Sequence, residues 1–515
     1  MDYSTGTDLT ASSEASRPGP ATAPWWRCLR LAVSFPAMMA VLLMALALIG
    51  AEDRLLDPDT WWHITVGQEI LKTHTWPTSD IYSFTARGAH WIEYEWLGDI
   101  FMALAAQNGT LVGLAWLQKA LVVLLTLLLY LYAYLVCGNS KVACVAAAML
   151  LPIAPVAFRL RPQLFGYIFL LLAMICVQLF QKGHERALYF LPPLFVVWVN
   201  THGTFVFGLL VIGISWITGL VSFCIGGLFG KQLPTGRRVK LLLAFLFCLL
   251  AVLITPYGSQ LAANPLDLAM AQPLNVANIQ EWQPLSLANP MGAYILMFAA
   301  ALFLGTVMLR LSYSIAEMAL LLFSIYAAFA HLRFTMIFIL FCVPVVAKIL
   351  TRWVPVYDAS KDKYLLNFVI MMLVVFSLIK FRPSESKLKA VVAADYPVEA
   401  LPYLREHPHP TGLFNEYGWG GYLISQLGPS QAVFIDGRGD LYEHSGVLVD
   451  YFAAASGQVE ALRVLASHNI SSCLVNRSSA LAALLAKSPG WKLVYSDGLA
   501  EIFDRTGMAR PRAGP

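Results

Sequence analysis

Charged residues are scarce in this chain of 515 residues. Only 13% of the residues are Asp, Glu, Lys or Arg and 58% are hydrophobic, against roughly a quarter and roughly half in an average soluble domain. This composition excludes an ordinary soluble enzyme. The 35 basic and 31 acidic residues leave a net charge of +4, which is too small and too scattered to indicate a nucleic-acid partner. We therefore expect no nucleic-acid binding.

Cysteine is also sparse, and its placement is uninformative for metal binding. Seven of the eight cysteines lie in or beside apolar runs without the spacing of metal ligands, and only Cys473 lies in the polar C-terminal region. No unit of 20 to 50 residues repeats along the chain, which argues against solenoids and propellers. The sequence thus predicts neither a disulfide framework nor a repeat architecture.

Long apolar runs are the most prominent feature of the sequence. A hydrocarbon core of about 30 Å requires about 20 mostly apolar residues, and such runs recur between Leu31 and Lys380. We expect about eleven transmembrane helices. The expected spans are residues 31–50, 110–136, 142–157, 164–180, 188–199, 205–228, 241–254, 291–309, 315–330, 334–349 and 364–379.

Lysine and arginine indicate the orientation of these spans. With a cytoplasmic N-terminus, the inner loops hold most of the basic residues, whereas the outer loop 257–290 holds none. Cytoplasmic loops carry an excess of Lys and Arg, so this asymmetry predicts a multi-pass protein of the cell's inner (plasma) membrane with its N-terminus inside. An odd number of spans then places the C-terminus outside.

Three regions follow from this pattern. Residues 1–30 begin with a Ser-, Thr-, Ala- and Pro-rich stretch and are expected to form a disordered cytoplasmic N-terminus. Residues 31–380 form the transmembrane region, with an outer loop at 51–96. In residues 381–515, helical patterns (398–406, 459–467 and 480–486) alternate with strand-like runs (432–435, 472–475, 492–495 and 500–503), which predicts a small extracytoplasmic α/β domain. The expected fold class is therefore an α-helical polytopic membrane protein with this domain at its C-terminus.

Two acidic clusters lie in the first outer loop. Asp57 and Asp59 follow the first span, and Glu93 and Glu95 precede the next helix. A carboxylate at a membrane surface can act as a general base toward a hydroxyl or can bind a divalent cation. Asp59, Asp57 and Glu95 are therefore the candidate catalytic residues, and Asp57, Asp59 and His63 are candidate ligands for Mg²⁺ or Mn²⁺.

Aromatic residues accompany these acids. Trp61 and Trp62 offer flat apolar faces on which sugar rings could rest, so we take both, with His63 and Glu93, as candidate substrate contacts. A plainer interpretation stays open, because Trp and Tyr gather at membrane interfaces in general and acids are normal in an exported loop.

Several basic residues fall on the same outer side, where the charge rule does not favour them. Arg159 and Arg161 lie in one short outer loop, and Arg333 lies in another. Guanidinium groups match phosphate oxygens, so these arginines, with His202, are candidates for binding the phosphate of a lipid. Pairing with the loop carboxylates or with ordinary lipid headgroups is the alternative for the arginines, and a hydrogen-bonded structural role is the alternative for His202.

Further candidates for substrate binding lie in other exported segments. Glu281 is in the outer loop that lacks basic residues, where packing of the loop is the alternative role. Trp419, Asp436 and Arg438 follow strand-like runs in glycine-rich turns. Loops at strand ends often bind ligands, although glycine also serves turns that need a positive φ.

The residues from Asp57 to His63, directly after the first span, resemble the polytopic glycosyltransferases of the GT-C fold, in particular bacterial relatives of protein mannosyltransferases and lipid A aminoarabinose transferases. The plan of many spans followed by an exported domain is similar over nearly the whole chain. Segments 161–163, 200–203, 281–283 and 434–438 resemble uncharacterised bacterial membrane proteins of this type. The Asp57-Pro58-Asp59 sequence departs from the Asp-Glu pair of the mannosyltransferases, which leaves the catalytic residue and the sugar open.

This resemblance implies a membrane glycosyltransferase. It implies a donor sugar on a polyprenyl phosphate, an extracytoplasmic acceptor (lipid, glycan or protein) and a carboxylate of the first outer loop as the group that activates the acceptor hydroxyl. Two other classes remain as alternatives: a lipid or polysaccharide transporter or flippase, and a non-catalytic protein of cell-envelope assembly. A transporter is expected to carry polar residues through its spans, whereas here they crowd one surface.

Overall fold

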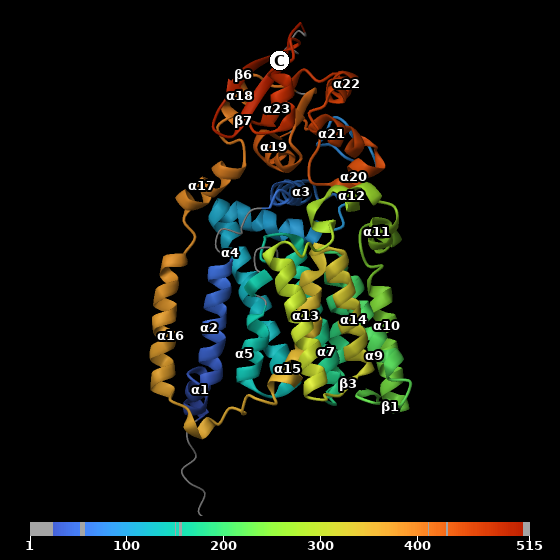
Figure 1. Ribbon diagram of the computed structural model, residues 1–515, viewed down its shortest axis with the longest axis vertical. Helices are drawn as coiled ribbons and strands as arrows, with labels where there is room; N and C mark the ends of the chain where they lie inside the picture. Colours follow the sequence, from blue (N-terminus) through green and yellow to red (C-terminus); the bar gives the residue numbers. More distant parts are fainter. Residues whose placement is uncertain are drawn as a thin grey trace, which may run out of the picture.

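The computed structural model describes residues 24–51, 57–149, 151–153, 157–409, 411–428 and 431–507. It consists of a bundle of long helices with a smaller domain at one end, and the N-terminal helix begins at the opposite end (Figure 1). Residues 1–23 of the N-terminal segment expected to be disordered lie outside the described residues, and Pro24–Ala32 form helix α1.

The bundle is built from apolar helices. Among the described residues, six stretches are long and apolar enough to cross a membrane: Cys28–Gly50, Leu111–Cys137, Pro162–Gln181, Pro290–Met308, Leu332–Leu350 and Tyr364–Phe381. Ser140–Ile153, Phe205–Thr218 and Ile315–Ala330 are shorter apolar stretches, so the count of about eleven spans stays a prediction. The helices are α1, α2 (Phe35–Gly50), α4 (Trp96–Cys137), α5 (Ser140–Ala148), α7 (Pro162–Gln181), α8 (Leu191–Val199), α9 (Phe205–Thr218), α10 (Thr235–Ala251), α13 (Pro290–Met308), α14 (Ile315–Ala330), α15 (Thr335–Leu350) and α16 (Tyr364–Leu378).

Some expected spans differ from these helices at their ends. The span 205–228 ends at Thr218, because Gly226 and Gly227 form the turn of a hairpin between β1 (Phe223–Ile225) and β2 (Leu228–Gly230). A Gly-Gly pair suits a two-residue hairpin turn, and Gly226 has a φ of 57°. Helix α4 begins 14 residues before the expected span at 110, and this first part lies across the end of the bundle (Figure 1). Part of the expected span 142–157 lies outside the described residues.

Two small sheets lie at opposite ends of the molecule (Figure 1). Strand β2 pairs antiparallel with β1 and parallel with β3 (Tyr313–Ser314) at the end far from the C-terminal domain. The C-terminal sheet has the order β4-β5-β7-β6, in which only β4 and β5 are parallel. Its strands are β4 (Leu413–Asn415), β5 (Ser472–Asn476), β6 (Trp491–Ser496) and β7 (Ala500–Arg505), and the helices of this region are α17 (Glu385–Asp395), α18 (Leu401–Glu406), α19 (Gly420–Leu427), α20 (Gly439–His444), α21 (Val447–Ala455), α22 (Val459–Ser467) and α23 (Ala480–Leu485).

One expected strand of this domain, at 432–435, does not join the sheet. Its backbone pairs instead with the first outer loop: the Val433 N–H donates to the Tyr82 carbonyl at 3.2 Å, and the Phe84 N–H donates to the Val433 carbonyl at 3.1 Å. The run 432–435 was expected to be a strand of the domain, but its backbone pairs with the first outer loop rather than with a neighbouring strand.

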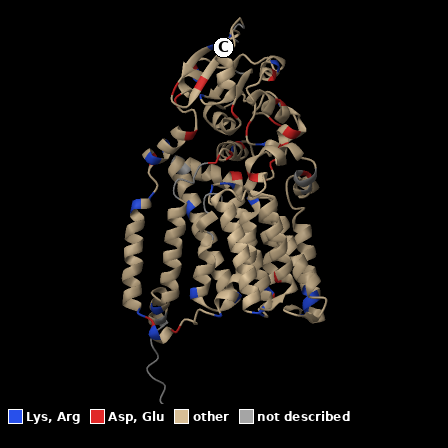
Figure 2. Cartoon of the chain, viewed as in Figure 1, with Lys and Arg blue, Asp and Glu red and all other residues tan. Residues whose placement is uncertain are grey.

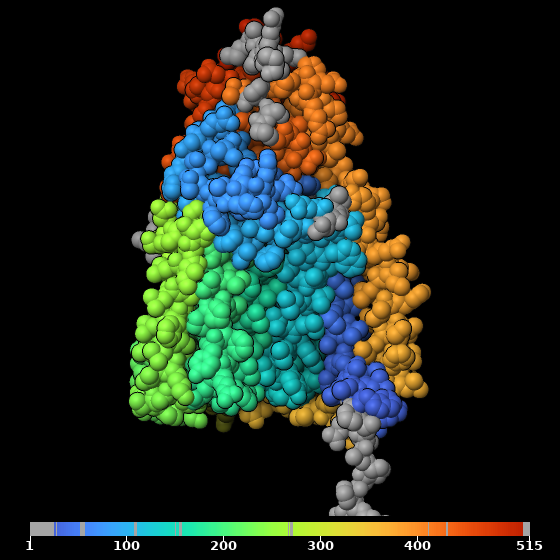
Figure 3. Space-filling view, turned by 180° about the vertical axis from the view of Figure 1, so that it is seen from behind, coloured from blue at the N-terminus to red at the C-terminus, as the bar shows by residue number. Residues whose placement is uncertain are grey.

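The first outer loop is the platform on which the C-terminal domain rests. Helix α3 (Thr60–Thr73) lies between the bundle and the domain in Figure 1. Trp61, Trp62 and Val66 of this helix share one hydrophobic core with Phe434 and Tyr422 of the domain. Seen from behind, segments of the first third of the chain fill the space between the bundle and the domain (Figure 3). The two halves of the chain therefore meet around the residues that follow Asp57.

Candidate functional site

A cavity of about 400 Å³ lies where the bundle, the first outer loop and the C-terminal domain meet. It brings together residues that are up to about four hundred positions apart in the sequence. Of the site residues expected from the sequence, the structure places these in its lining: Asp57, Asp59, Trp62, His63, Glu93, Glu95, Arg159, Arg161, His202, Glu281, Arg333 and Arg438.

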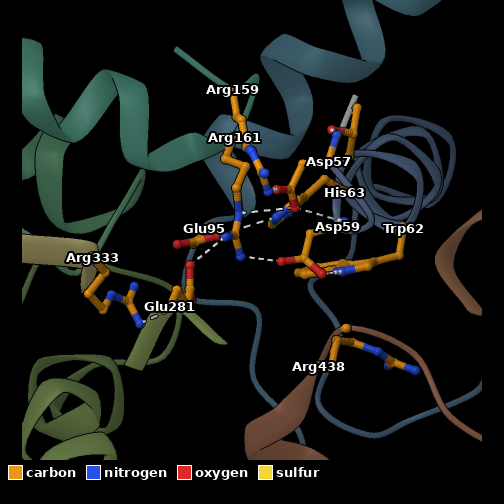
Figure 4. Close-up of polar contacts among 12 residues, drawn as sticks. Asp57, Asp59, Trp62, His63, Glu95, Arg159, Arg161, Glu281, Arg333 and Arg438 are labelled. Atoms are coloured by element: carbon orange, nitrogen blue, oxygen red, sulfur yellow. Dashed lines mark hydrogen bonds and ion pairs between the residues drawn. The ribbon is translucent and has the colours of Figure 1, made fainter. Parts of the chain in front are cut away.

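Arg161 lies among three carboxylates that line this cavity, those of Asp57, Asp59 and Glu281 (Figure 4). It immediately precedes α7, and Pro162 begins that helix. Its Nη1 atom is 2.8 Å from Glu281 Oε2, its Nη2 atom contacts Asp59 Oδ2, and its Nε atom is 3.5 Å from Asp57 Oδ1. Arg159 Nη1 also lies 3.1 Å from Asp57 Oδ2. Pairing with carboxylates, one of the two alternatives for these arginines, is therefore what the structure contains.

Glu281 links Arg161 to Arg333. Its second oxygen, Oε1, lies 3.4 Å from Arg333 Nη1, and the Arg333 guanidinium stacks on the Trp282 ring at 4.0 Å from its centroid. Burial alone would raise the pKa of Glu281, but the two guanidinium charges outweigh it and lower the pKa to about 2. Glu281 is therefore ionised and keeps two arginines side by side.

Asp59 occupies the N-cap position of α3, yet its side chain makes no capping hydrogen bond. Its Oδ1 atom accepts a hydrogen bond from Trp62 Nε1 at 3.2 Å, and Oδ2 contacts Arg161. Burial raises the pKa of Asp59 to about 7, although the Arg161 charge opposes this rise. The Asp59 side chain therefore does not cap α3, although capping would be the simplest structural role for an aspartate at this position. Asp57 instead shapes the start of the helix, since its Oδ1 accepts from the Asp59 N–H at 3.2 Å.

Glu95 lies between two histidines. Its Oε1 atom is 3.2 Å from His202 Nε2, and its Oε2 atom is 3.5 Å from His63 Nε2. Burial lowers the pKa of both imidazoles well below the usual value, so they are neutral at pH 7. Burial likewise raises the pKa of Glu95 to about 8, with Arg161 and Arg333 opposing it. Burial therefore favours the protonated form of Glu95.

Asp99 completes this group and was not among the residues expected from the sequence. Its Oδ1 atom is 2.6 Å from His63 Nδ1, and its side chain is fully buried. The spacing of four residues from Glu95, at the start of α4, places both carboxyl groups on one side of the helix, so this signal was available. Tyr94, Gln163, Asn275, Tyr417 and Asp440 also line the cavity and were not among the expected site residues, although Gln163 lies in the segment 161–163 noted in the sequence.

The expected metal ligands do not converge on one point. Asp57 and Asp59 are held by Arg159 and Arg161, and the ring nitrogens of His63 face Asp99 and Glu95. Among the described residues, His63, Glu93 and Asp99 offer ligand atoms within 4.8 Å of one another. The 2.6 Å between His63 and Asp99 is a hydrogen-bond distance, shorter than the roughly 3 Å between neighbouring ligands of an octahedral ion with bonds of about 2.1 Å. In this arrangement His63 and Asp99 share a hydrogen bond, and their spacing does not match the coordination of a divalent cation.

Three expected substrate contacts lie outside the cavity lining, and all three hold the C-terminal domain in place. The Asp436 carboxylate accepts hydrogen bonds from Arg438 Nε at 2.8 Å and from Tyr442 at 2.7 Å, and it is fully buried. Trp61 packs edge-on against Tyr396 and Tyr422, and Trp419 Nε1 donates to the Asp395 carbonyl at 2.9 Å. These side chains therefore have partners in the interior of the protein, and their part in substrate binding stays a prediction.

Arg438 joins the C-terminal domain to the first outer loop. Its Nη1 atom lies 2.7 Å from Asp80 Oδ1, its Nη2 atom lies 2.6 Å from Asp436 Oδ2, and its guanidinium packs 4.6 Å from the centroid of Trp91. Its side chain is 1% exposed. Arg438 thus touches the cavity wall, while its charge is compensated by two buried carboxylates.

A second, apolar cavity of about 270 Å³ adjoins the polar one. It shares Glu95, His202 and Arg333 with the polar cavity, and its other walls include Phe207 of α9 and Ile337 of α15. The polar site is therefore continuous with an apolar space between helices of the bundle.

No protein-family model and no curated protein matches the chain by sequence. Among solved structures, ArnT from Cupriavidus metallidurans is similar with a TM-score of 0.51 at 12% identity, covering 93% of this chain and 97% of that one. An oligosaccharyltransferase from Archaeoglobus fulgidus has a TM-score of 0.49 at 11% identity, covering 85% of this chain and 69% of that one, which is too weak a likeness to carry weight. At these identities the likeness concerns the fold alone, and at that level it confirms the resemblance to the GT-C fold.

Proposed function

We propose that the chain is an inverting membrane glycosyltransferase that moves a sugar from a polyprenyl phosphate to a hydroxyl of an extracytoplasmic acceptor. The observation that carries this proposal is the junction of Arg161, Arg333 and buried carboxyl groups in one cavity at the end of a bundle of apolar helices. A lipid-borne phosphate and a water-borne acceptor can meet there, and neither needs to cross the membrane.

The arginine side of the cavity suits the donor. Two guanidinium groups that are held close together by one carboxylate, Glu281, form a rigid fork for phosphate oxygens. Arg159 and His202 extend this polar wall. The adjoining apolar cavity would take the first isoprene units, since Phe207 of α9 and Ile337 of α15 line it together with Arg333.

Asp59 is the proposed general base. It takes the proton from the acceptor hydroxyl while the acceptor oxygen bonds to the anomeric carbon, and the bond from that carbon to the phosphate oxygen breaks with its electron pair remaining on the phosphate. Arg161 and Arg333 compensate the charge that develops there. A base works best with a pKa near the operating pH, and that of Asp59 lies at about 7. Glu95, whose pKa is about 8, lies between two imidazoles and is better suited to holding a proton, and Asp57 shapes the start of α3 by accepting from the Asp59 N–H.

The proposed topology has about eleven spans, a cytoplasmic N-terminus and an extracytoplasmic C-terminal domain in the inner (plasma) membrane. Figure 2 supports it, because basic residues mark the end of the bundle far from the C-terminal domain, while acidic residues gather at the domain and at its junction with the bundle. The site would then face the extracytoplasmic side.

The charged residues argue against the transporter alternative. In the described part of the chain they lie toward the two ends of the bundle (Figure 2). Between Thr335 and Lys348, the largely buried helix α15 contributes only apolar side chains and Pro344 to the interior of the bundle. A polar pathway along this helix would need polar side chains at that depth.

Lipid analysis of a deletion strain tests the function most broadly. We expect a polyprenyl-phosphate sugar to accumulate when the gene is deleted, and to be consumed by the purified, lipid-reconstituted protein when an acceptor extract is added. A strain complemented with the Asp59→Asn variant should accumulate the same lipid. Unchanged polyprenyl-phosphate sugars in both strains would contradict a transferase and would favour a non-catalytic envelope protein.

A further inference from the structure

A loop of the C-terminal domain packs directly on the Asp59 carboxylate. Gly437 lies so close that a Cβ atom added to it would overlap Asp59 Oδ1, and it would stand 2.9 Å from Asp59 Cγ and 3.1 Å from Trp62 Nε1. Non-bonded carbon atoms normally approach to about 3.5–4.0 Å. Only a residue without a side chain leaves room for the carboxylate as it stands.

The backbone conformation at this position does not itself require glycine. Gly437 is not among the glycines of the described chain that have a positive φ. Its neighbour across the domain, Gly421 of α19, shows the same situation: it is helical, and an added Cβ would lie 2.8 Å from the Pro58 carbonyl and 3.2 Å from Trp62 Cδ1. Both glycines are therefore explained by close approach to α3 and its start: Gly437 to Asp59 and Trp62, and Gly421 to Pro58 and Trp62.

The loop that carries Gly437 has little freedom to retreat. The Gly437 carbonyl accepts hydrogen bonds from the Gly439 N–H at 2.9 Å and from Tyr417 Oη at 3.2 Å. Its chain neighbours are Asp436 and Arg438, whose buried ion pair is tied to Asp80 of the first outer loop. Moving the loop away from Asp59 would disturb this pair.

Asp59 is confined from the other directions as well. Arg161 contacts Oδ2, and Trp62 Nε1 donates to Oδ1. The Gly437 backbone closes a third side of the carboxylate. The orientation of the carboxylate is thus set jointly by α3, by the segment before α7 and by the C-terminal domain.

We propose that Gly437 is a positioning residue of the transferase, through which the C-terminal domain fixes the orientation of the Asp59 carboxylate. Gly421 supports it by seating the same domain on Pro58 and Trp62. This inference rests on the proposed function, because it assigns the C-terminal domain a part in the catalytic centre itself. It also predicts a specific sensitivity to a single methyl group at position 437.

The test compares Gly437→Ala with Gly498→Ala. Gly498 lies in an exposed turn between β6 and β7, and nothing stands within 4 Å of an added Cβ, so this variant is the matched control. A displacement of about 1 Å at a reacting group can lower turnover about 10²-fold, and we expect a loss of kcat of this order in Gly437→Ala with little change in the KM for the donor lipid. Gly498→Ala should behave as the unchanged protein does.

A second readout does not depend on catalysis. Carbodiimide labelling of carboxyl groups, quantified by mass spectrometry, should increase at Asp59 in Gly437→Ala and stay unchanged at the partly exposed Asp450. If Gly437→Ala does not yield folded protein, Gly421→Ala in the adjacent contact replaces it, and labelling at Asp59 is again expected to increase. Wild-type kcat and wild-type labelling in the folded glycine variant would overturn the inference.

The double variant separates this inference from the proposed function. If Gly437 acts through Asp59, Gly437→Ala should cost little further turnover in an Asp59→Asn background, because the two changes remove the same contribution. A slow Asp59→Asn with a normal Gly437→Ala would refute positioning and leave the base assignment standing. A normal Asp59→Asn with altered labelling in Gly437→Ala would refute the base and leave the positioning contact standing.

Discussion

The guanidinium of Arg161 contacts the carboxylate of Asp59, and the same guanidinium lies 2.8 Å from Glu281. Arg161, which we propose to bind the donor phosphate, and Asp59, the proposed base, therefore belong to one ion-pair network. Because the charge of Arg161 lowers the pKa of Asp59, a donor phosphate that draws the arginine toward itself would raise that pKa, which makes the carboxylate more basic but leaves a larger fraction of it protonated at pH 7. Binding of the donor and activation of the acceptor are coupled through this arginine.

The planar guanidinium of Arg161 is needed to bind the donor phosphate and the neighbouring carboxylates at the same time. Lysine keeps the charge but has no planar pair of donors, so Arg161→Lys should weaken binding of the polyprenyl-phosphate lipid about tenfold or more, the equivalent of one charged hydrogen bond. Arg333→Lys should act in the same direction. Binding to the reconstituted protein is the measurement, with the exposed Arg463→Lys as the control. Unchanged affinity for the lipid in both Arg161→Lys and Arg333→Lys would mean that these arginines pair with carboxylates and do not bind the phosphate.

Arg438 and Asp436 are expected to act on stability rather than on substrate. Arg438→Met would leave Asp80 and Asp436 buried without their partner, and breaking a buried ion pair costs about 3–5 kcal/mol. We expect a clearly lower Tm and faster proteolysis around α17, the connection to the C-terminal domain. If Asp436→Asn instead kept its Tm and lost only affinity for the acceptor, the substrate role suggested by the sequence would be correct.

Chelation tests the argument about metal ligands. Because arginines occupy Asp57 and Asp59, and His63 is bonded to Asp99, transfer should continue in EDTA without added Mg²⁺ or Mn²⁺. Transfer that stops in EDTA and recovers with one of these cations would contradict this expectation. Asp99→Asn should then raise the cation concentration required, because the ligand atoms of His63, Glu93 and Asp99 lie within 4.8 Å of one another.

The orientation of the bundle can be tested with inserted tags. A tag at Gly236, in the first turn of α10, should be accessible only from the cytoplasm, whereas tags at Asn289 and after Pro515 should be accessible only from outside. Gly236 has nothing within 4 Å of an added Cβ, so an insertion there should not disturb packing. An externally accessible tag at Gly236 would invert the proposed topology.

Composition and charge placement predicted much of the site. The long apolar runs located most of the bundle helices, and the charges stranded on one side of the spans turned out to share a cavity. These features can be recognised from short stretches of sequence. A membrane span is recognised by its length and apolar composition, and an arginine in a short outer loop is recognised from the spans on either side of it.

Long-range partners could not be predicted in this way. Arg438 pairs with Asp80 across more than three hundred residues, and the run 432–435 looks the same whether its partner is a strand or a loop. Gly437 looked like an ordinary turn glycine, and only its approach to Asp59 explains it. Such contacts depend on how the C-terminal domain docks, which no local pattern encodes.

The pH dependence of transfer bears on the identity of the base. Burial raises the pKa of Asp59 to about 7, and a base must be unprotonated, so kcat should fall as the pH drops below 7. The same pKa shift has the opposite effect on stability. Between pH 4 and 7 the folded state binds more protons than the unfolded state, so the free energy of unfolding decreases as the pH rises through this window. Asp59→Asn should remove both effects.

The most direct test of the account is the turnover of Asp59→Asn in purified, lipid-reconstituted protein, with Asp450→Asn as the control. Asparagine keeps the shape of the side chain, and a general base contributes about 10²–10⁴-fold, so kcat should fall by that order while donor binding stays close to wild type. Glu95→Gln, measured in parallel, should lose less. Near-normal turnover in Asp59→Asn would contradict the base assignment, and near-normal turnover in Asp57→Asn and Glu95→Gln as well would leave the transferase account without its catalyst.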